Sequence, residues 1–435
     1  MERILISKIK EKIGQKTKII GWVYNIRDIG SIKFLVIRDV SGIIQVVVSG
    51  EELIKVVKPI RLESIVEIIG IVKTEKQAPG GIEIMAEEIK IISIPLETPP
   101  ISVLEKEETE ASLEKRMDWR WIDLRKPRKQ LIFKVWTTME MAFRKWWLEH
   151  GFIQIHSPKL MSAASEIGSE LFQISYFNGK AYLAQSPQFY KQMAMASGFE
   201  KVFEIGPVFR ANPSFTSRHD TEFTSYDIEM SFIESHQKLI ETEQEMFVRM
   251  ISEITEKYGE EIEKEFGRKL VIPTIPFPQI TMKEAKEMLS HYDIKNRREG
   301  DLSPEEERKL SEIIKEKYGH EFCFVTEYPS SVRPFYHMRP QGDSKFTKSF
   351  DLLWNGLEIT TGAQREHRYE VLKKQAIEKG IKTEEIKHYL EFFKYGCPPH
   401  GGFAIGATRL LMKIFNIGNV REVTYLYRGV KRLTP

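Results

Sequence analysis

Three basic side chains stand close together in the stretch "GPVFRANPSFTSRHDTEFTSYDIEMSF", residues 206–232. The pattern predicts two short strands joined by a long polar loop. Arg210 ends the first strand, whereas Arg218 and His219 lie in the loop. Phe223 begins the second strand, where an aromatic ring could stack on a base. Cations beside a stacking ring suit a nucleotide triphosphate.

The second strand of this hairpin, taken as residues 222–232, has two different faces because side chains alternate along a strand. The even positions from Thr224 to Phe232 are mostly apolar and predict a core face. The odd positions include Asp227 and predict a face that could hold a metal ion or an ammonium group. Ordinary solvent exposure of this odd face is the alternative.

A second hairpin is predicted in "FDLLWNGLEITTG", residues 350–362, because Asn-Gly is a strong two-residue turn signal. That turn would pair Leu353 with Glu358 and set Asp351 opposite Thr360. Asp351 and Glu358 would then lie diagonally on one face, within reach of a shared cation. Two carboxylates without sulfur or imidazole ligands fit Mg²⁺. A plain surface pair is the alternative.

A third element is "PPHGGFAIGATRLLMKIF", residues 398–415, which predicts a glycine-punctuated strand followed by a helix. The bend falls at Gly406, and Arg409 lies in the first helical turn. A helix N-terminus beside an arginine favours anions. By itself this signal is weak, and the chain contains neither a G-x-x-x-x-G-K-[ST] loop nor a strand–GxGxxG–helix unit.

Other parts of the chain must position these elements. Residues 16–95 contain five β-branched runs separated by short turns, which favours a small barrel such as the OB-fold. A long apolar-periodic helix is expected over 130–150, and mixed strands and helices follow it. The charged amphipathic helices within 234–265 and 281–318 are expected to lie on the solvent-exposed surface and to play no part in the chemistry.

This organisation predicts two folded domains and a connection. The expected parts are an N-terminal β-barrel (OB-fold) over residues 1–97, a linker or hinge over 98–128, and an α+β catalytic domain with a mainly antiparallel sheet flanked by helices over 129–435.

The composition is that of an ordinary globular protein. The 435 residues include 65 Lys+Arg and 62 Asp+Glu, so the net charge of +3 argues against a histone-like coat of charge. The two cysteines are too few for a disulfide framework or a zinc cluster, and a reducing, cytoplasmic location is expected. No signal peptide and no membrane span is predicted.

The three elements together resemble the three signature motifs of class II aminoacyl-tRNA synthetases. The helix at 130–150 with "FIQIHSPKL" would be motif 1, the first hairpin motif 2, and "GFAIGATR" motif 3. The chain is most similar to aspartyl-tRNA synthetases of the archaeal and eukaryotic type. The most specific segments are "QSPQFYKQ" (185–192), "FEIGPVFRA" (203–211), "GAQREHR" (362–368) and "PPHGGF" (398–403).

The resemblance implies a role for each matching residue. ATP would be bound by Arg210, Arg218, His219, Phe223, Glu358, Gly406 and Arg409, with Arg210 and Arg409 as the catalytic residues. Aspartate would be bound by Glu166, Ser186, Gln188, Lys191, Asp227, Thr361 and Arg365. Mg²⁺ would be held by Asp351, Glu358 and Thr361, and anticodon bases by Arg27, Phe34 and Gln45. Lys191 and Arg365 would grip the side-chain carboxylate of aspartate.

The implied function is that of an aspartate–tRNA ligase acting on tRNA(Asp), as a homodimer formed through motif 1 at Pro158. An asparaginyl-tRNA synthetase is one alternative, and the ammonium group of Lys191 argues against it. A non-catalytic RNA-binding paralogue is another, and an enzyme that makes free asparagine is a third. The sequence leaves open whether tRNA(Asn) is also charged, since Tyr24 and Pro79 do not decide this.

Two positions depart from the family pattern. Asn212 stands where the family usually has a glutamate, so activity is expected with a weakened contact to ATP. Ala404 replaces a common glycine in motif 3 and is expected to be tolerated. In the barrel, Phe34 has an alternative interpretation as a core residue.

Overall fold

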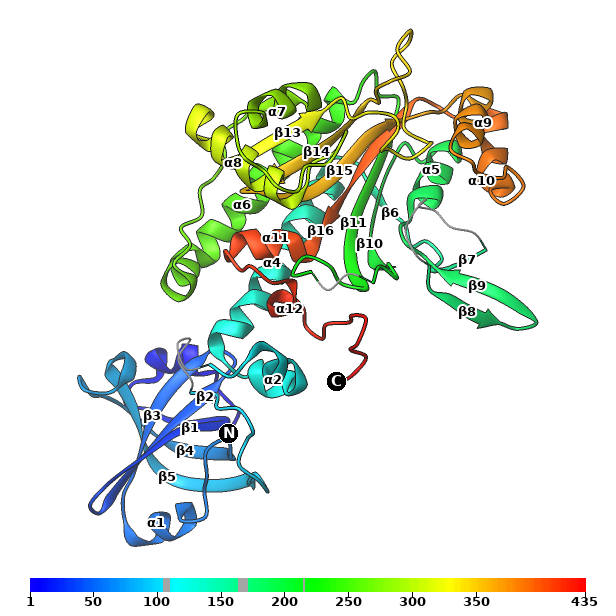
Figure 1. The fold of residues 1–435 in the computed structure, drawn as a ribbon. Helices are drawn as coiled ribbons and strands as arrows, with labels where there is room; N and C mark the ends of the chain where they lie inside the picture. Colours follow the sequence, from blue (N-terminus) through cyan, green and yellow to red (C-terminus); the bar gives the residue numbers. More distant parts are fainter. Residues whose placement is uncertain (105–109, 163–170, 214–215) are drawn as a thin grey trace. The chain divides into compact units, whose positions relative to one another are not determined.

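The computed structural model describes residues 1–104, 110–162, 171–213 and 216–435. The chain divides into two compact units, residues 1–131 and residues 132–434 (Figure 1). Each unit has its own sheet and its own core.

The first unit is built around a closed barrel of five strands in the order β1-β2-β3-β5-β4. Its elements are η1 (Ile6–Lys12), β1 (Lys16–Ile29), β2 (Ile32–Asp39), β3 (Gly42–Val48), α1 (Glu51–Val57), β4 (Ile65–Thr74), η2 (Pro79–Gly81), β5 (Ile82–Ser93), α2 (Leu113–Asp118) and α3 (Arg120–Asp123). The five-stranded barrel expected from the sequence is confirmed.

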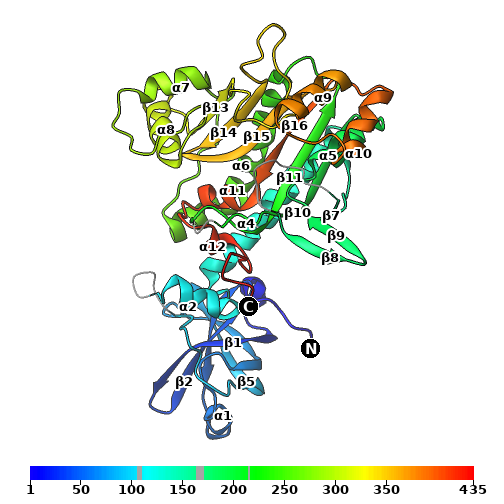
Figure 2. The ribbon, with the colours of Figure 1, turned by 45° about the vertical axis from the view of Figure 1, so that its right-hand side comes forward.

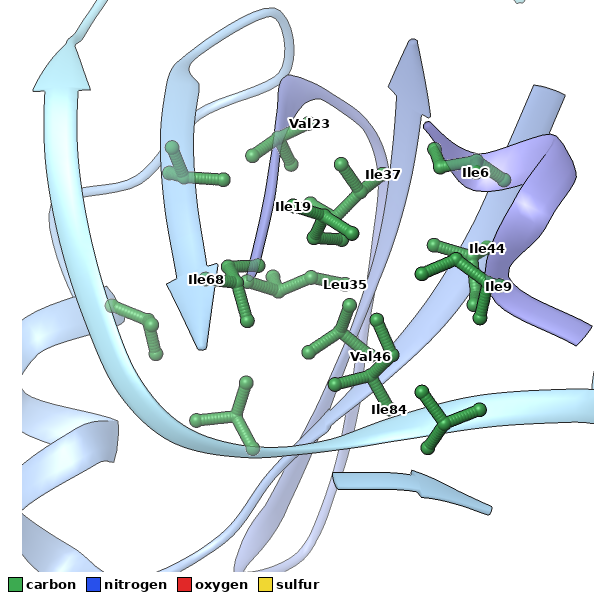
Figure 3. Packing of buried hydrophobic residues seen from close by; sticks show 14 of the residues in the cluster. Ile6, Ile9, Ile19, Val23, Leu35, Ile37, Ile44, Val46, Ile68 and Ile84 are labelled. Carbon is green, nitrogen blue, oxygen red and sulfur yellow. The ribbon is translucent and has the colours of Figure 1, made fainter. Parts of the chain in front are cut away.

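Branched aliphatic side chains fill the barrel. Leu35 and Ile37 from β2 meet Ile44 and Val46 from β3 inside it, and all four are at most 1% exposed (Figure 3). Since side chains alternate along a strand, Phe34 points away from this core. The alternative in which Phe34 is a core residue is therefore wrong.

The second unit contains an eight-stranded sheet in the order β12-β13-β14-β15-β16-β11-β10-β6. Its first elements are α4 (Pro127–Glu149), β6 (Ile153–Gln154), β7 (Leu160–Met161), β8 (Gln173–Tyr176), β9 (Gly179–Leu183), α5 (Gln188–Ala196), β10 (Lys201–Phe209), β11 (Glu222–Ser231) and α6 (Gln237–Phe266). These are followed by β12 (Gln279–Thr281), α7 (Met282–Leu289), α8 (Pro304–Tyr318), β13 (Phe322–Thr326), β14 (Ser349–Trp354) and β15 (Leu357–Arg365). The last are α9 (Tyr369–Glu378), α10 (Lys387–Glu391), η4 (Phe392–Tyr395), β16 (His400–Gly406), α11 (Ala407–Ile414) and α12 (Val420–Val423).

Most neighbouring strands of the large sheet are antiparallel, whereas β6 with β10 and β12 with β13 are parallel. Strands β7, β9 and β8 form a separate small sheet. Helices pack against the large sheet, and β16 runs directly into α11 (Figures 1 and 2). The expected α+β fold with a mainly antiparallel sheet is confirmed.

One face of β11 packs against helices. Phe143 of α4 contacts Tyr226 of β11 and Phe247 of α6, with ring centroids 6.0 and 5.7 Å apart. The apolar face expected for this strand is therefore correct up to Met230. Phe232 was expected in the same face but is 68% exposed, because the chain leaves the strand with a positive φ of 57° at that residue.

Candidate active site

A cavity of about 280 Å³ opens on the other face of the sheet. It lies where the three elements that the sequence singles out come together, because β16 pairs with β11 on one side and with β15 on the other. Residues predicted for ATP or aspartate that line it are Ser186, Gln188, Lys191, Arg210, Arg218, His219, Phe223, Glu358, Thr361, Arg365, Gly406 and Arg409. Asn212 and Ala404, the two departures from the family pattern, line it as well.

Two of the predicted residues that the structure describes, Asp227 and Asp351, do not line the cavity. Asp227 accepts a hydrogen bond from Lys191, and Asp351 accepts one from Arg333; both of these cations line the cavity. Glu166 lies outside the residues that the structure describes.

The odd face of β11 carries buried carboxylates. Asp227 and Glu229 are 2% and 0% exposed, so the solvent-exposure alternative for this face is wrong. Lys191 of α5 reaches both of them, with Nζ 3.1 Å from Asp227 Oδ1 and 3.3 Å from Glu229 Oε2. The structure thus brings Lys191 and Asp227, both predicted to bind aspartate, into direct contact.

Arg365 is fixed beside the carboxylate of Glu229. Its Nε donates to Glu229 Oε1 over 2.9 Å, and its Nη1 lies 3.1 Å from His337 Nε2. Burial favours the neutral form of Glu229, but Arg365 and Lys191 outweigh it and lower the pKa of that carboxyl. Burial and then Arg365 lower the pKa of His337 far below its usual range, so its ring is neutral.

The second hairpin has a different register from the one expected. Leu353 pairs with Glu358 as predicted, but a bulge follows and Asp351 pairs with Thr361 instead of Thr360. The extra residue rotates Thr361 onto the face of Glu358, and Thr361 Oγ1 donates to Glu358 Oε1 over 3.2 Å. The bulge therefore places Thr361 beside both carboxylates.

Arg333 is a site residue that sequence reasoning missed. Its Nη2 lies 2.5 Å from Asp351 Oδ2, and its guanidinium stacks on the Tyr328 ring with a distance of 3.6 Å to the centroid. It belongs to the segment between β13 and β14, whose prolines and glycine indicate turns. These signals do not distinguish Arg333 from the other basic residues of the segment.

The carboxylates of this hairpin fit a hard cation. Asp351 Oδ1 is buried without a hydrogen-bond partner, and burial raises the pKa of Asp351 to about 6 despite the nearby Arg333. Burial alone would raise the pKa of Glu358, but Arg409 and then Arg333 outweigh it and lower it. Within the described ranges no group of three His, Cys, Asp or Glu side chains could hold a metal. A bound Mg²⁺ would thus need further oxygen ligands from substrate or water.

Basic side chains surround the remaining part of the cavity. Arg409 donates through Nη1 to the carbonyl and to Oε1 of Glu358, over 2.9 and 3.2 Å. The Arg210 guanidinium lies 5.5 Å from the centre of the Phe223 ring, and its Nε is buried without a partner. His219 was grouped with the cations, but burial and then Arg409 lower its pKa, so it is neutral at pH 7.

Arg218 is held by a helix that was expected to lie on the surface without a role in the site. Its Nη1 donates to Glu307 Oε2 over 2.7 Å, and its Nη2 to the Gly356 carbonyl over 3.2 Å. Glu307 belongs to α8 and is 7% exposed. The expectation that the 281–318 segment plays no part in the site is therefore wrong for Glu307, which has no distinguishing signal among its neighbouring glutamates.

The three barrel residues predicted to meet an anticodon share one outward face. Arg27 pairs with Phe34 across β1 and β2, and its Nη2 donates to Gln45 Oε1 over 2.7 Å. Tyr24 lies under the Arg38 guanidinium, 5.2 Å from it, and Pro79 is exposed in η2.

A separate OB-fold barrel and a mainly antiparallel sheet with a cationic cavity define the architecture of class II aminoacyl-tRNA synthetases. The chain belongs to the family of class II tRNA synthetases (D, K and N), whose model matches residues 112–428. Residues 17–92 match the OB-fold nucleic acid binding domain. No helix of the described residues is long and apolar enough to cross a membrane.

Curated relatives and solved structures agree with this membership. The chain is 42% identical to aspartate–tRNA(Asp/Asn) ligase of Methanopyrus kandleri, over 98% of this chain and 97% of that protein. It is 41% identical to aspartate–tRNA(Asp) ligase of Pyrococcus abyssi, over 99% and 98%. The asparaginyl-tRNA synthetase of Pyrococcus horikoshii superimposes with a TM-score of 0.92 at 33% identity, covering 100% of both chains. The aspartyl-tRNA synthetase of Entamoeba histolytica gives 0.89 at 32% identity, covering 100% and 93%.

Proposed function

We propose that this protein activates L-aspartate with ATP to aspartyl-adenylate and transfers the aspartyl group to the 3′ end of tRNA(Asp). The observation that carries this proposal is the joint position of Lys191 and Arg365 on the cavity wall. Two buried cations suit a substrate with a side-chain carboxylate. Full-length relatives named as aspartate–tRNA ligases support the same substrate.

The charge of the cavity wall supports binding of ATP together with an acidic amino acid. Six cationic side chains line it, namely Lys191, Arg210, Arg218, Arg333, Arg365 and Arg409, against the carboxyl groups of Asp220 and Glu358. Such a wall attracts a polyphosphate and offsets charge that develops at phosphorus. Phe223 offers a ring face to the adenine base, and Arg409 lies where it could contact the phosphates.

The first step needs positioning and charge stabilisation, not a protein nucleophile. An oxygen of the aspartate α-carboxylate attacks the α-phosphorus of ATP, the bond to the bridging oxygen breaks, and pyrophosphate leaves with the electron pair. Arg210 and Arg409 offset the negative charge on the reacting phosphate. Asp351, Glu358 and Thr361 would hold Mg²⁺, which when bound supplies further charge neutralisation of the phosphates.

The second step joins the two units in function. The terminal ribose hydroxyl of the tRNA attacks the carbonyl carbon of the adenylate, and AMP leaves. The outward barrel face with Arg27, Phe34 and Gln45 would bind the anticodon, by stacking on splayed bases and contacts to their edges. Residues 1–97 would thus be the anticodon-binding domain and residues 129–435 the catalytic domain, with 98–128 between them. These reactions would take place in the cytoplasm.

The same proposal includes a homodimer formed through motif 1. The groove lined by Phe133, Trp136, Thr137, Glu140, Met141 and Tyr425 lies on α4, the motif 1 helix. Met141 and Leu148 of this helix are 46% and 63% exposed, and Pro158 is exposed beyond it. An exposed apolar helix face of this kind supports a subunit contact.

Asparagine is the second candidate substrate, because the asparaginyl-tRNA synthetase of Pyrococcus horikoshii has the same fold. An amide side chain would leave Lys191 without a new carboxylate partner, whereas aspartate supplies one. Pyrophosphate exchange into ATP, measured with each amino acid in turn, tests the proposal. Aspartate should support exchange at least about 100-fold better than asparagine. Equal or better exchange with asparagine would overturn it.

A further inference from the structure

Glu307 of α8 contacts a residue of the cavity wall, Arg218, without lining the cavity itself. Its Oε2 accepts a hydrogen bond from Arg218 Nη1 over 2.7 Å, and the side chain is only 10% exposed. Arg218 in turn lines the cavity. A charge-assisted contact between two largely buried groups is among the stronger polar contacts in proteins.

The Arg218 guanidinium is fixed from two directions. Glu307 holds one terminal nitrogen, and the Gly356 carbonyl at the tip of the β14–β15 hairpin accepts from the other over 3.2 Å. A guanidinium has five N–H donors, so donors remain for an anion in the cavity. Arg218 is thus presented to the cavity while it stays paired with Glu307.

The position of Arg218, held at the tip of the β14–β15 hairpin, indicates which part of ATP it meets. Phe223 lies at the start of β11, and Gly356 lies at the turn into β15, with β16 between these strands. Two strand spacings amount to about 10 Å. If adenine stacks on Phe223, the triphosphate must extend across this width before it reaches Arg218. Arg218 therefore faces the phosphates farthest from the base.

We infer that Glu307 is a positioning residue that fixes Arg218 for the β- and γ-phosphates of ATP. This inference rests on the proposed function only in taking ATP as the nucleotide. Glu307 acts through Arg218 and touches no substrate. In the competing interpretation, Glu307 occupies Arg218 and must release it before ATP can bind.

The direct test measures ATP binding by calorimetry, without aspartate, for the wild type and Glu307→Gln. Burial raises the pKa of Glu307 to about 7, so binding is measured at pH 8, where the substitution keeps the size of the side chain and removes its charge. We expect the Kd of ATP to rise about tenfold, in line with a charged hydrogen bond. The Kd of AMP should stay within about twofold, because AMP lacks the phosphates that Arg218 meets. Glu312→Gln is the matched control, since Glu312 lies on the same helix, is exposed, and pairs with the half-buried Lys309.

A double-mutant cycle separates positioning from a general structural effect. In an Arg218→Ala background, Glu307→Gln should cause little further loss of ATP affinity, because the contact through which it acts is gone. Equal losses in both backgrounds would overturn the inference. Tighter ATP binding by Glu307→Gln would overturn it in favour of the competing interpretation.

Steady-state exchange gives a readout that loss of folding would not mimic. The KM for ATP should rise for Glu307→Gln while the KM for aspartate and the melting temperature stay at wild-type values. A rise in both KM values together with a lower melting temperature would contradict a positioning role. Because the ATP-binding test needs no amino acid, it remains valid even if aspartate is not the substrate.

Discussion

Lys191 and Asp227 form a buried ion pair, with Nζ 3.1 Å from Oδ1, and the same Nζ lies 3.3 Å from Glu229 Oε2. Lys191 therefore neutralises two carboxylates of the protein before any substrate binds. Truncating it would leave buried charge unpaired, which typically costs about 3–5 kcal/mol. The substitution Lys191→Leu should thus affect both the fold and the chemistry.

We predict that Lys191→Leu abolishes aspartate-dependent pyrophosphate exchange and lowers the melting temperature. ATP binding, measured well below that temperature, should stay within about threefold of wild type, because the proposed function assigns Lys191 to aspartate and not to ATP. Lys374→Leu on α9 is the control, since Lys374 is exposed. Aspartate activation within threefold of wild type would contradict the assignment of Lys191 to aspartate binding.

Glu358 is expected to carry most of the Mg²⁺ dependence. It is ionised, accepts from Thr361 and pairs with Arg409 over 3.2 Å. Glu358→Gln keeps the size and removes the charge, so exchange should fall by about two orders of magnitude or more at every Mg²⁺ concentration. Titrating MgCl₂ against both proteins checks this. If rate and Mg²⁺ requirement are unchanged, the metal is bound elsewhere.

Glu243 of α6 predicts a pH dependence of stability. It is fully buried, Thr360 Oγ1 donates to its Oε1 over 2.5 Å, and burial raises its pKa from 4.5 to about 8. Between these values the folded state holds a proton that the unfolded state releases. Glu243 therefore makes the free energy of unfolding fall as pH rises from about 4.5 to 8, by at most about 1.4 kcal/mol per pH unit.

Glu243→Gln is neutral at every pH and removes this contribution. Melting curves at pH 5 to 8 should show the variant gaining stability relative to wild type as the pH increases. Parallel curves for the two proteins would show that Glu243 does not titrate in this range.

Phe34 and Leu35 give a matched pair on β2, since one points outward and the other into the barrel core. Phe34→Ala should raise the KM for tRNA about tenfold, because stacking on a base is worth about 1–3 kcal/mol. It should spare pyrophosphate exchange and the melting temperature. Leu35→Ala should lower the melting temperature, because a buried leucine is worth about 2–5 kcal/mol. An unchanged KM for tRNA in Phe34→Ala would reject the anticodon assignment.

The sequence predicted the parts of the fold that local patterns encode. Runs of β-branched residues predicted the barrel. The Asn-Gly pair predicted the β14–β15 turn, and Leu353 pairs with Glu358 as expected. The register beyond that pair was wrong by one residue. A bulge depends on packing across the sheet, and neither strand carries a glycine or proline there that would mark it.

Contacts between distant segments were the main omission for the site. Arg333 reaches Asp351 from a segment without regular structure, and Glu307 reaches Arg218 from an amphipathic helix. Arg333 and Glu307 stand in sequence patterns that are typical of exposed charged residues. Only the tertiary fold shows that both are largely buried beside the cavity. The lowered pKa of His219 was missed for the same reason, since it follows first from burial and then from Arg409, which is far away in the sequence.

The measurement that tests the account most directly is the identity of the amino acid that the purified protein attaches to tRNA. The protein is incubated with ATP, Mg²⁺, aspartate and asparagine in equal amounts, and with tRNA(Asp) or tRNA(Asn) transcripts in separate reactions. Mass spectrometry of the terminal aminoacyl-adenosine then identifies the product. The account predicts aspartyl-adenosine from tRNA(Asp), and the tRNA(Asn) reaction shows whether the enzyme discriminates between the two tRNAs. Asparaginyl-adenosine as the main product, or no product with ATP bound normally, would contradict it.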